Sequence, residues 1–281
     1  MHSWLNNTKF KKMKTREKSI KDIVKSKYNL IAKQTKKQNE SSCCGSTGCC
    51  DSVDYTIFSD DYSQLKGYNA DADLGLGCGL PTEHANISEG DTVLDLGSGA
   101  GNDCFVARSI VGESGKVIGL DFAPNMLKKA RQNAENLGYE NVVFIRGDIE
   151  DMPIADTSVD VIVSNCVLNL VPDKAKAFSH MYSVLKPNGH FCVSDVVLQG
   201  ELPDEFIKDA EMYAGCVSGA IQKNNYLDII EAAGFKGITI KKEKEVIIPD
   251  EILANYLDEE GMNEYKSREL GIYSITVYAN K

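Results

Sequence analysis

A short apolar run that ends in three glycines constrains this chain more than any other feature. Residues 93–101 read Val-Leu-Asp-Leu-Gly-Ser-Gly-Ala-Gly and predict a buried strand that turns sharply into a helix. Glycine permits such a turn and lets the backbone approach a ligand closely. Asp121 lies twenty residues beyond Gly101, at the end of the next apolar run. This order of strand, glycine loop and acid indicates a nucleotide-binding α/β unit.

Predicted strands and helices alternate from residue 92 onward. Strands are predicted at 92–96, 116–120, 142–146, 159–164, 190–195, 237–246 and 273–279, and helices at 103–111, 124–137, 174–185, 203–214 and 226–233. Apolar strands that alternate with helices predict a parallel sheet covered on both faces. We therefore expect an α/β fold with a Rossmann-like, seven-stranded, mostly parallel sheet flanked by helices. Residues 198–225 would form an insertion after the fifth strand.

The N-terminal region differs in charge from the rest of the chain. Residues 1–40 carry a net charge of +9, whereas the remainder carries −19. Such an arm can bind polyanions, but a charged run more often folds against a body of opposite charge, which is the interpretation we favour. Apolar residues from Ile20 to Ile31 recur at helical spacing and predict an amphipathic helix over 20–32. Residues 34–54 are predicted to be a loop, or a segment that only a ligand orders.

The composition of the chain indicates the cellular compartment in which we expect the protein. No run of eighteen apolar residues is present, so we expect no membrane span. The lysine-rich start is not followed by an apolar run, which argues against a secretory signal. Nine cysteines are an odd number, and three of them lie in apolar, core-like runs. We therefore expect reduced thiols in a cytoplasmic protein, with no nucleic-acid or membrane partner.

Polar residues near the ends of the predicted strands suggest how a nucleotide would bind. Asp121 can accept hydrogen bonds from both ribose hydroxyls, and Asp148 with Ile149 can flank an adenine ring. Asp95 is expected to brace the glycine loop and to face a cationic amino group. The third glycine comes one position too early for the dinucleotide fingerprint, so that class of ligand is disfavoured.

Together these features resemble the seven-stranded S-adenosylmethionine-dependent methyltransferases over residues 71–281. The resemblance implies that the glycine loop passes close to the methionine moiety and ribose, with Asp121 on the ribose and Asp148 and Ile149 near the adenine. With Asp95 and Asn165 added, the predicted cofactor-binding residues are Asp95, Gly97, Ser98, Gly99, Gly101, Asp121, Asp148, Ile149 and Asn165.

Three cysteines lie where such a fold places its substrate. Cys78 sits between two glycines, Cys166 follows the fourth strand, and Cys216 lies in the insertion. The flanking glycines are expected to leave a thiol exposed. Cys104 and Cys192, within a predicted helix and strand, are interpreted as core residues.

Residues 73–79, 164–174 and 215–220 resemble arsenite methyltransferases, as do the cysteine pairs 43–44 and 49–50 and the strand segment 273–277. The resemblance implies Cys166 and Cys216 as arsenic ligands and Cys78 as a third thiol. An N-terminal thiol, for which we favour Cys44, would capture or relay arsenic. The expected units are residues 1–70, a basic arm with the cysteine-rich segment; 71–197, the S-adenosylmethionine-binding core; and 198–281, the arsenic-site insertion and the completion of the sheet.

The expected chemistry suits thiols. Trivalent arsenic prefers sulfur ligands, and three thiolates leave its lone pair free to attack a sulfonium methyl group. No side-chain base is needed, so catalysis would consist mainly of positioning. A reduced thiol such as glutathione or thioredoxin is expected as co-substrate, and arsenite or its thiol conjugates as substrate.

Three alternatives remain open at this stage. The chain could methylate a small organic molecule, which would require an activating base. It could instead be a thiol-rich metalloid-binding protein without turnover. The N-terminal cysteines could also hold zinc, although Cys44-x4-Cys49 lies at the edge of the usual ligand spacing.

Overall fold

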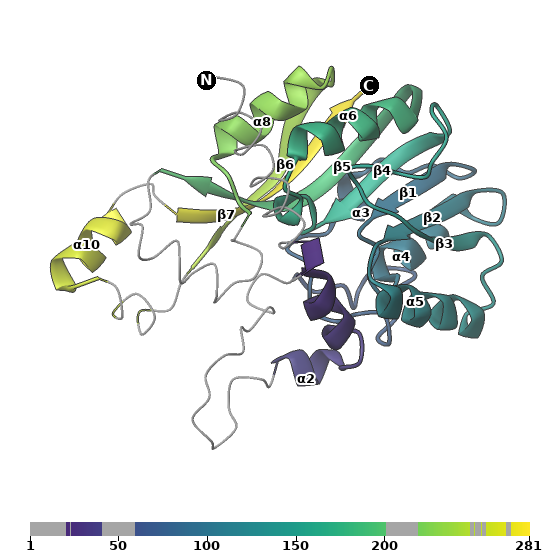
Figure 1. Cartoon of the computed structure of the whole chain (residues 1–281), viewed down its shortest axis with the longest axis horizontal. Coiled ribbons are helices and arrows are strands. Elements are labelled where there is room, and N and C mark those ends of the chain that lie inside the picture. The colour runs from purple at the N-terminus through teal and green to yellow at the C-terminus, as the bar shows by residue number, and fades with distance from the viewer. Residues whose placement is uncertain are drawn as a thin grey trace, which may run out of the picture.

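The computed structural model describes residues 21–22, 24–40, 60–200, 219–247, 250, 254, 257–267 and 271–281 (Figure 1). The predicted helix over 203–214 lies outside these residues, and so do Cys43, Cys44, Cys49, Cys50 and Cys216.

One seven-stranded sheet organises the described chain. Its strands are β1 (Thr92–Leu96), β2 (Lys116–Asp121), β3 (Val142–Arg146), β4 (Val159–Asn165), β5 (Leu185–Gln199), β6 (Lys236–Val246) and β7 (Gly271–Asn280). They are ordered β3-β2-β1-β4-β5-β7-β6, with β1 to β5 parallel and β7 antiparallel to both of its neighbours. The predicted Rossmann-like, mostly parallel sheet is confirmed. The order reverses at β1, so the carboxyl ends of β1 and β4 flank the expected ligand crevice.

Helices cover both faces of the sheet (Figure 1). Those packed on it are α4 (Asn102–Val111), α5 (Pro124–Asn136), α6 (Lys174–Val184) and α8 (Lys223–Ala232). The other described helices are α2 (Lys36–Glu40), α3 (Pro81–His84) and α10 (Glu259–Ser267), with a 3-10 turn η3 (Leu168–Leu170). Successive strand residues point to opposite faces. Val93 therefore joins the apolar cluster under α4 and α5, whereas Leu94 joins the cluster under α6 and α8.

Strand β5 is longer than predicted. Residues 186–189 were expected to form a turn before the strand, but they lie within β5 as a bulge. Val159 pairs with Leu185, whereas Val161 pairs with His190. Asn188 adopts the left-handed conformation with φ of 67°, which asparagine tolerates. This local bend accommodates the extra residues of β5 opposite β4. The strand also runs continuously past residue 197, where we had placed a unit boundary.

The described part of the N-terminal arm folds onto the body, as predicted. Residues 21–22 and 24–31 are helical, and Ile31 is buried against the core. The backbone N–H of Asn125 donates to Asn29 Oδ1 at 3.0 Å, and Lys36 pairs with Asp73 at 2.7 Å. Leu30, expected on the buried face, is 62% exposed.

Among the described residues, no helix combines the length and apolar character needed to cross a membrane.

Candidate functional site

A partly open cavity of about 1130 Å³ lies at the carboxyl ends of β1, β2 and β4. Nine of the predicted site residues line it: Asp95, Gly97, Ser98, Gly99, Asp121, Asp148, Ile149, Asn165 and Cys166. Gly101 and Cys78 do not line it, although Gly101 closes the loop that does. The predicted residues therefore converge on one cavity, as expected of a small-molecule site.

The glycine loop is fixed by backbone hydrogen bonds and by one carboxylate. Gly97 and Gly99 have φ of 71° and 52°, a region that favours glycine. The N–H of Gly97 donates to the Leu120 carbonyl at 2.7 Å. Asp121 Oδ2 accepts the N–H of Gly99 at 2.9 Å, and its Oδ1 accepts the N–H of Ala123 at 2.7 Å. The acid that braces the loop is thus Asp121, at the end of β2, and the expectation that Asp95 does so was wrong.

Three carboxyl groups, those of Asp95, Asp103 and Asp121, line the cavity. Burial raises the pKa of Asp95 well above its usual range, and the charges of Asp103 and Asp121 raise it further. Burial also raises the pKa of Asp103, to about 6. It raises the pKa of Asp121 above its usual value as well. The groups that act on the Asp95 pKa include no cation. A positively charged ligand would supply the missing counter-charge, as a sulfonium cofactor with an ammonium group does.

Ser98 provides a further polar atom in the same cavity. Its hydroxyl is buried and has no hydrogen-bond partner within the described structure. Buried hydroxyls are normally paired, because a lost hydrogen bond is costly. Because Ser98 also lines the cavity, its hydroxyl and the three carboxyl groups suit a ligand with polar and positively charged groups, such as S-adenosylmethionine.

The two described candidate thiols lie at the edge of this cavity, but they are not exposed. Cys78 is 1% exposed and Cys166 is 2% exposed, so the expectation of an exposed thiol between glycines was wrong. Cys166 has φ of 59°, an unusual conformation for a side-chain-bearing residue at the end of a strand. Its N–H donates to the Ser194 carbonyl at 2.8 Å. Burial and the neighbouring Asp195 raise the pKa of the Tyr226 hydroxyl most, and Cys78 and Cys166 lie near enough to raise it further.

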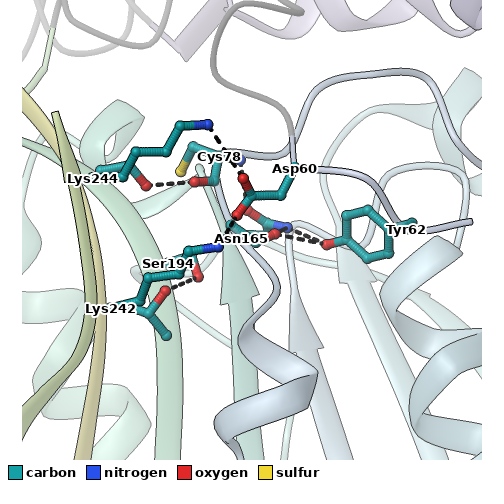
Figure 2. Close-up of polar contacts among 10 residues, drawn as sticks. Asp60, Tyr62, Cys78, Asn165, Ser194, Lys242 and Lys244 are labelled. Atoms are coloured by element: carbon teal, nitrogen blue, oxygen red, sulfur yellow. Dashed lines mark hydrogen bonds and ion pairs between the residues drawn. The ribbon is translucent and has the colours of Figure 1, made fainter. Parts of the chain in front are cut away.

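Tyr62, which no sequence pattern marked, links the loop that carries Cys78 to the cavity (Figure 2). The Tyr62 hydroxyl lies 2.9 Å from an Asp103 carboxylate oxygen and 3.1 Å from the Gly79 carbonyl. It also accepts a hydrogen bond from Asn165 Nδ2. Tyr62 lies in an irregular segment with no periodic pattern, so no sequence signal marked it.

Two further contacts refine the predictions for the cavity wall. Cys104 and Cys192 are both fully buried, as expected of core residues, but the Cys104 thiol also donates to Asp95 Oδ2 at 3.1 Å. The Asp148 carboxylate pairs with Lys21 at 2.7 Å. Lys21 also pairs with Glu150 at 2.6 Å, so the N-terminal helix closes one side of the cavity.

Comparison with known proteins agrees with this geometry. Residues 87–234 match the family described as a methyltransferase domain, which defines the class of this fold and cavity. The chain is 39% identical over 273 residues to an arsenite methyltransferase of Halobacterium salinarum, covering 93% of this chain and 66% of that protein. It is 38% identical over 169 residues to the human arsenite methyltransferase, covering 57% and 44% of the two chains.

Among solved structures, CrArsM, an arsenic(III) S-adenosylmethionine methyltransferase from Chlamydomonas reinhardtii, superposes with a TM-score of 0.61. That match has 36% identity and covers 73% of this chain and 67% of the other. The chain belongs to the methyltransferase-domain family, in the branch of the arsenite methyltransferases, as its cysteine motifs predicted. It spans about two-thirds of the Halobacterium relative and less than half of the human one.

Proposed function

We propose that this protein transfers a methyl group from S-adenosylmethionine to thiol-bound trivalent arsenic. One observation carries the proposal. The Asn165 side chain, on the wall of the acidic cavity, accepts the Cys78 N–H at 2.9 Å, and Cys166 is the next residue along the chain. Two thiol loops far apart in sequence therefore meet at the cavity that suits a cationic methyl donor.

The acidic cavity would hold the methyl donor. Asp95 and Asp103 would face its positive groups, Asp121 would bind the ribose hydroxyls while it braces the glycine loop, and Ser98 would supply a hydroxyl. When bound, the donor supplies an electrophilic methyl group on a sulfonium. The chain's own contribution is to orient that group and to exclude water from it.

The thiols would hold the arsenic. Cys166, Cys216 and Cys78 would bind it through sulfur and leave its lone pair directed at the methyl group. An arsenic trithiolate carries no proton to remove, so the reaction requires no general base. Cys166, Cys216 and Cys78 would thus hold arsenic in line with the sulfonium methyl group, so that the arsenic lone pair could form the new bond while the sulfonium sulfur kept the electron pair of the broken sulfur–carbon bond.

Contacts near both undescribed cysteine segments support this arrangement. A side chain at Gly219 would lie 1.7 Å from the Asn169 carbonyl oxygen, so the chain that follows Cys216 packs tightly on the Cys166 loop. On the N-terminal side, Asn39 Nδ2 donates to the Leu74 carbonyl at 2.8 Å, and Leu74 lines the cavity. Tyr62 anchors the chain again after the cysteine-rich segment. These anchors favour a capture or relay role for an N-terminal thiol such as Cys44.

We also propose a reduced thiol, glutathione or thioredoxin, as co-substrate, and a cytoplasmic location. Thiolate ligands must stay reduced to bind arsenic, and reduced thiols are the normal state in the cytosol. The same reasoning makes arsenite and its thiol conjugates the substrates.

Arsenic speciation tests the proposal. Purified protein mixed with arsenite, S-adenosylmethionine and a thiol should yield methylarsenicals. Cys166→Ser and Cys216→Ser should each abolish methylation while the dissociation constant for S-adenosylmethionine stays unchanged. Cys192→Ser is the matched control for Cys166→Ser, because Cys192 is buried like Cys166 but packs in the core. Absence of methylarsenicals despite cofactor binding, or activity that survives either site variant, would contradict the proposal.

A further inference from the structure

The backbone of Cys78 is held from two sides by side chains from distant parts of the chain. On one side, its N–H donates to Asn165 Oδ1 at 2.9 Å (Figure 2). On the other, Ser274 Oγ, from the final strand, donates to the Cys78 carbonyl. Asn165 Nδ2 also donates to the next carbonyl, that of Gly79, at 2.8 Å. Hydrogen bonds at both ends of one peptide segment fix its position and its rotation.

The two glycines that flank Cys78 show how closely neighbouring side chains pack around this segment. A Cβ atom at Gly77 would lie 2.7 Å from Asn165 Nδ2, and one at Gly79 would lie 2.5 Å from Ser194 Oγ. Neither glycine has a positive φ. Close approach of neighbouring side chains, rather than an unusual backbone conformation, therefore requires glycine here.

Ser274 is an unusual residue in its surroundings. It is 5% exposed and lies in a strand whose buried neighbours include Ile272, Ile275 and Val277. A buried hydroxyl needs a partner, and its partner is the Cys78 carbonyl. Ser274 does not line the cavity, so its contact with Cys78 is separate from any contact with the methyl donor.

We propose that Ser274 and Asn165 are positioning residues that clamp the Cys78 peptide and so fix where its thiol stands relative to Cys166. The inference rests on the proposed function, since it assigns Cys78 a place among the arsenic ligands. Asn165 lines the cavity and also holds the Cys78 peptide, whereas Ser274 holds the Cys78 peptide without lining the cavity. Ser274 is therefore the residue that isolates the effect of the clamp.

The test compares three variants on the last strand. Ser274→Ala removes the clamp hydroxyl, and Ser274→Thr retains it. Thr276→Val is the matched control, because its buried hydroxyl bonds to Ser194 Oγ at 2.8 Å rather than to Cys78. For each variant we would measure the melting temperature, the dissociation constant for S-adenosylmethionine, kcat, the KM for arsenite, and the near-ultraviolet absorption that arsenic–thiolate bonds add.

Ser274→Ala should raise the KM for arsenite by about five-fold, the effect of one lost hydrogen bond, with S-adenosylmethionine binding unchanged. Ser274→Thr should restore most of the affinity. Thr276→Val should lower the melting temperature by a similar amount to Ser274→Ala and leave the KM for arsenite unchanged. The clamp is disproved if Ser274→Ala keeps the wild-type KM, or if Thr276→Val changes it equally.

Alkylation of Cys78 separates this result from failure of the proposed function. If the wild-type protein neither binds nor methylates arsenite, the proposed function fails, but the clamp still predicts a change at Cys78. Its labelling by N-ethylmaleimide, followed by mass spectrometry and normalised to Cys166, should accelerate several-fold in Ser274→Ala and not in Thr276→Val. Equal labelling in the two variants would overturn the clamp whatever the substrate is.

Discussion

The Cys104 thiol donates a hydrogen bond to Asp95 Oδ2 at 3.1 Å, which ties a core cysteine of α4 to a carboxylate on the cavity wall. This contact lowers the pKa of Asp95 against the effect of burial, which raises it well above the usual range. Cys104 therefore favours the charged form of the acid that is expected to face the methyl donor.

Cys104→Ala should weaken S-adenosylmethionine binding. Loss of the thiol raises the Asp95 pKa further, so less negative charge faces a cationic ligand. We expect about a five-fold rise in the dissociation constant, measured by calorimetry at neutral pH. Cys192→Ala is the control, because Cys192 belongs to the same buried cluster without touching Asp95. Equal weakening by both variants would show that packing, not the hydrogen bond, is responsible.

Asp195→Asn should flatten the pH dependence of stability. Burial raises the pKa of Asp195 to about 7, although Lys174 and the Tyr226 hydroxyl act in the opposite direction. Between the ordinary carboxyl value and this raised value, the native state keeps a proton that the unfolded chain has released. The free energy of unfolding therefore falls as pH rises through this window, by about 4 kcal/mol for this group.

Urea unfolding from about pH 4 to 8 checks this slope, since the window lies between the unfolded and folded pKa values. Tyr226→Phe should have the opposite effect to Asp195→Asn, because it should extend the pH range over which the free energy of unfolding falls. Without its hydrogen bond of 3.0 Å the Asp195 pKa rises further, so stability continues to fall at higher pH. A wild-type slope in Asp195→Asn would rule out this residue as the source.

Lys21→Ala should loosen the N-terminal helix over the cavity. Lys21 pairs with Asp148 and Glu150, but all three side chains are partly exposed, so the pairs contribute only about 0–1 kcal/mol to stability. We expect S-adenosylmethionine affinity to fall several-fold at low salt, with a smaller difference at high salt. Lys186→Ala breaks the similarly exposed pair with Asp160, outside the cavity lining, and should leave affinity unchanged. An affinity loss that salt does not reduce would argue against the ion pairs.

Gly97→Ala and Gly99→Ala should differ in stability although both glycines have positive φ. A Cβ at Gly97 would lie 2.4 Å from Val167 Cγ2, whereas one at Gly99 meets nothing within 4 Å. Gly99→Ala should cost about 1–2 kcal/mol from backbone strain alone. Gly97→Ala should cost a further 1–3 kcal/mol, roughly the penalty of overpacking. Chemical denaturation measures both, and equal losses would mean that the Val167 side chain moves aside freely.

The sequence predicted the five parallel strands because each is marked by buried β-branched residues. The bounds of β1 and β3 agree with the prediction to the residue. Buried apolar runs identify strands wherever both faces are covered by helices, as they are here. The bulge at residues 186–189 was missed because its residue types are those of a turn, and only pairing with β4 shows that the strand continues.

For the site, the glycine loop and the strand-end acids were predictable because their positions follow from strand ends. The Tyr62 contacts, the Cys104–Asp95 hydrogen bond and the burial of Cys78 were not. Each depends on which distant segments pack together, and local pattern carries no information on that. That Asp121 rather than Asp95 braces the loop was missed for the same reason, since both lie near the end of a strand and only the fold decides which one meets the Gly99 N–H.

Ser274 and Cys78 are 196 residues apart, and β7 lies between β5 and β6 in the sheet. Because β7 leaves the ribosome after the other six described strands, β6 has no partner within the described sheet until β7 has been made. The Cys78 peptide gains its second anchor only at that moment. A chain that has not yet reached β7 therefore lacks part of the geometry that the proposed arsenic site requires.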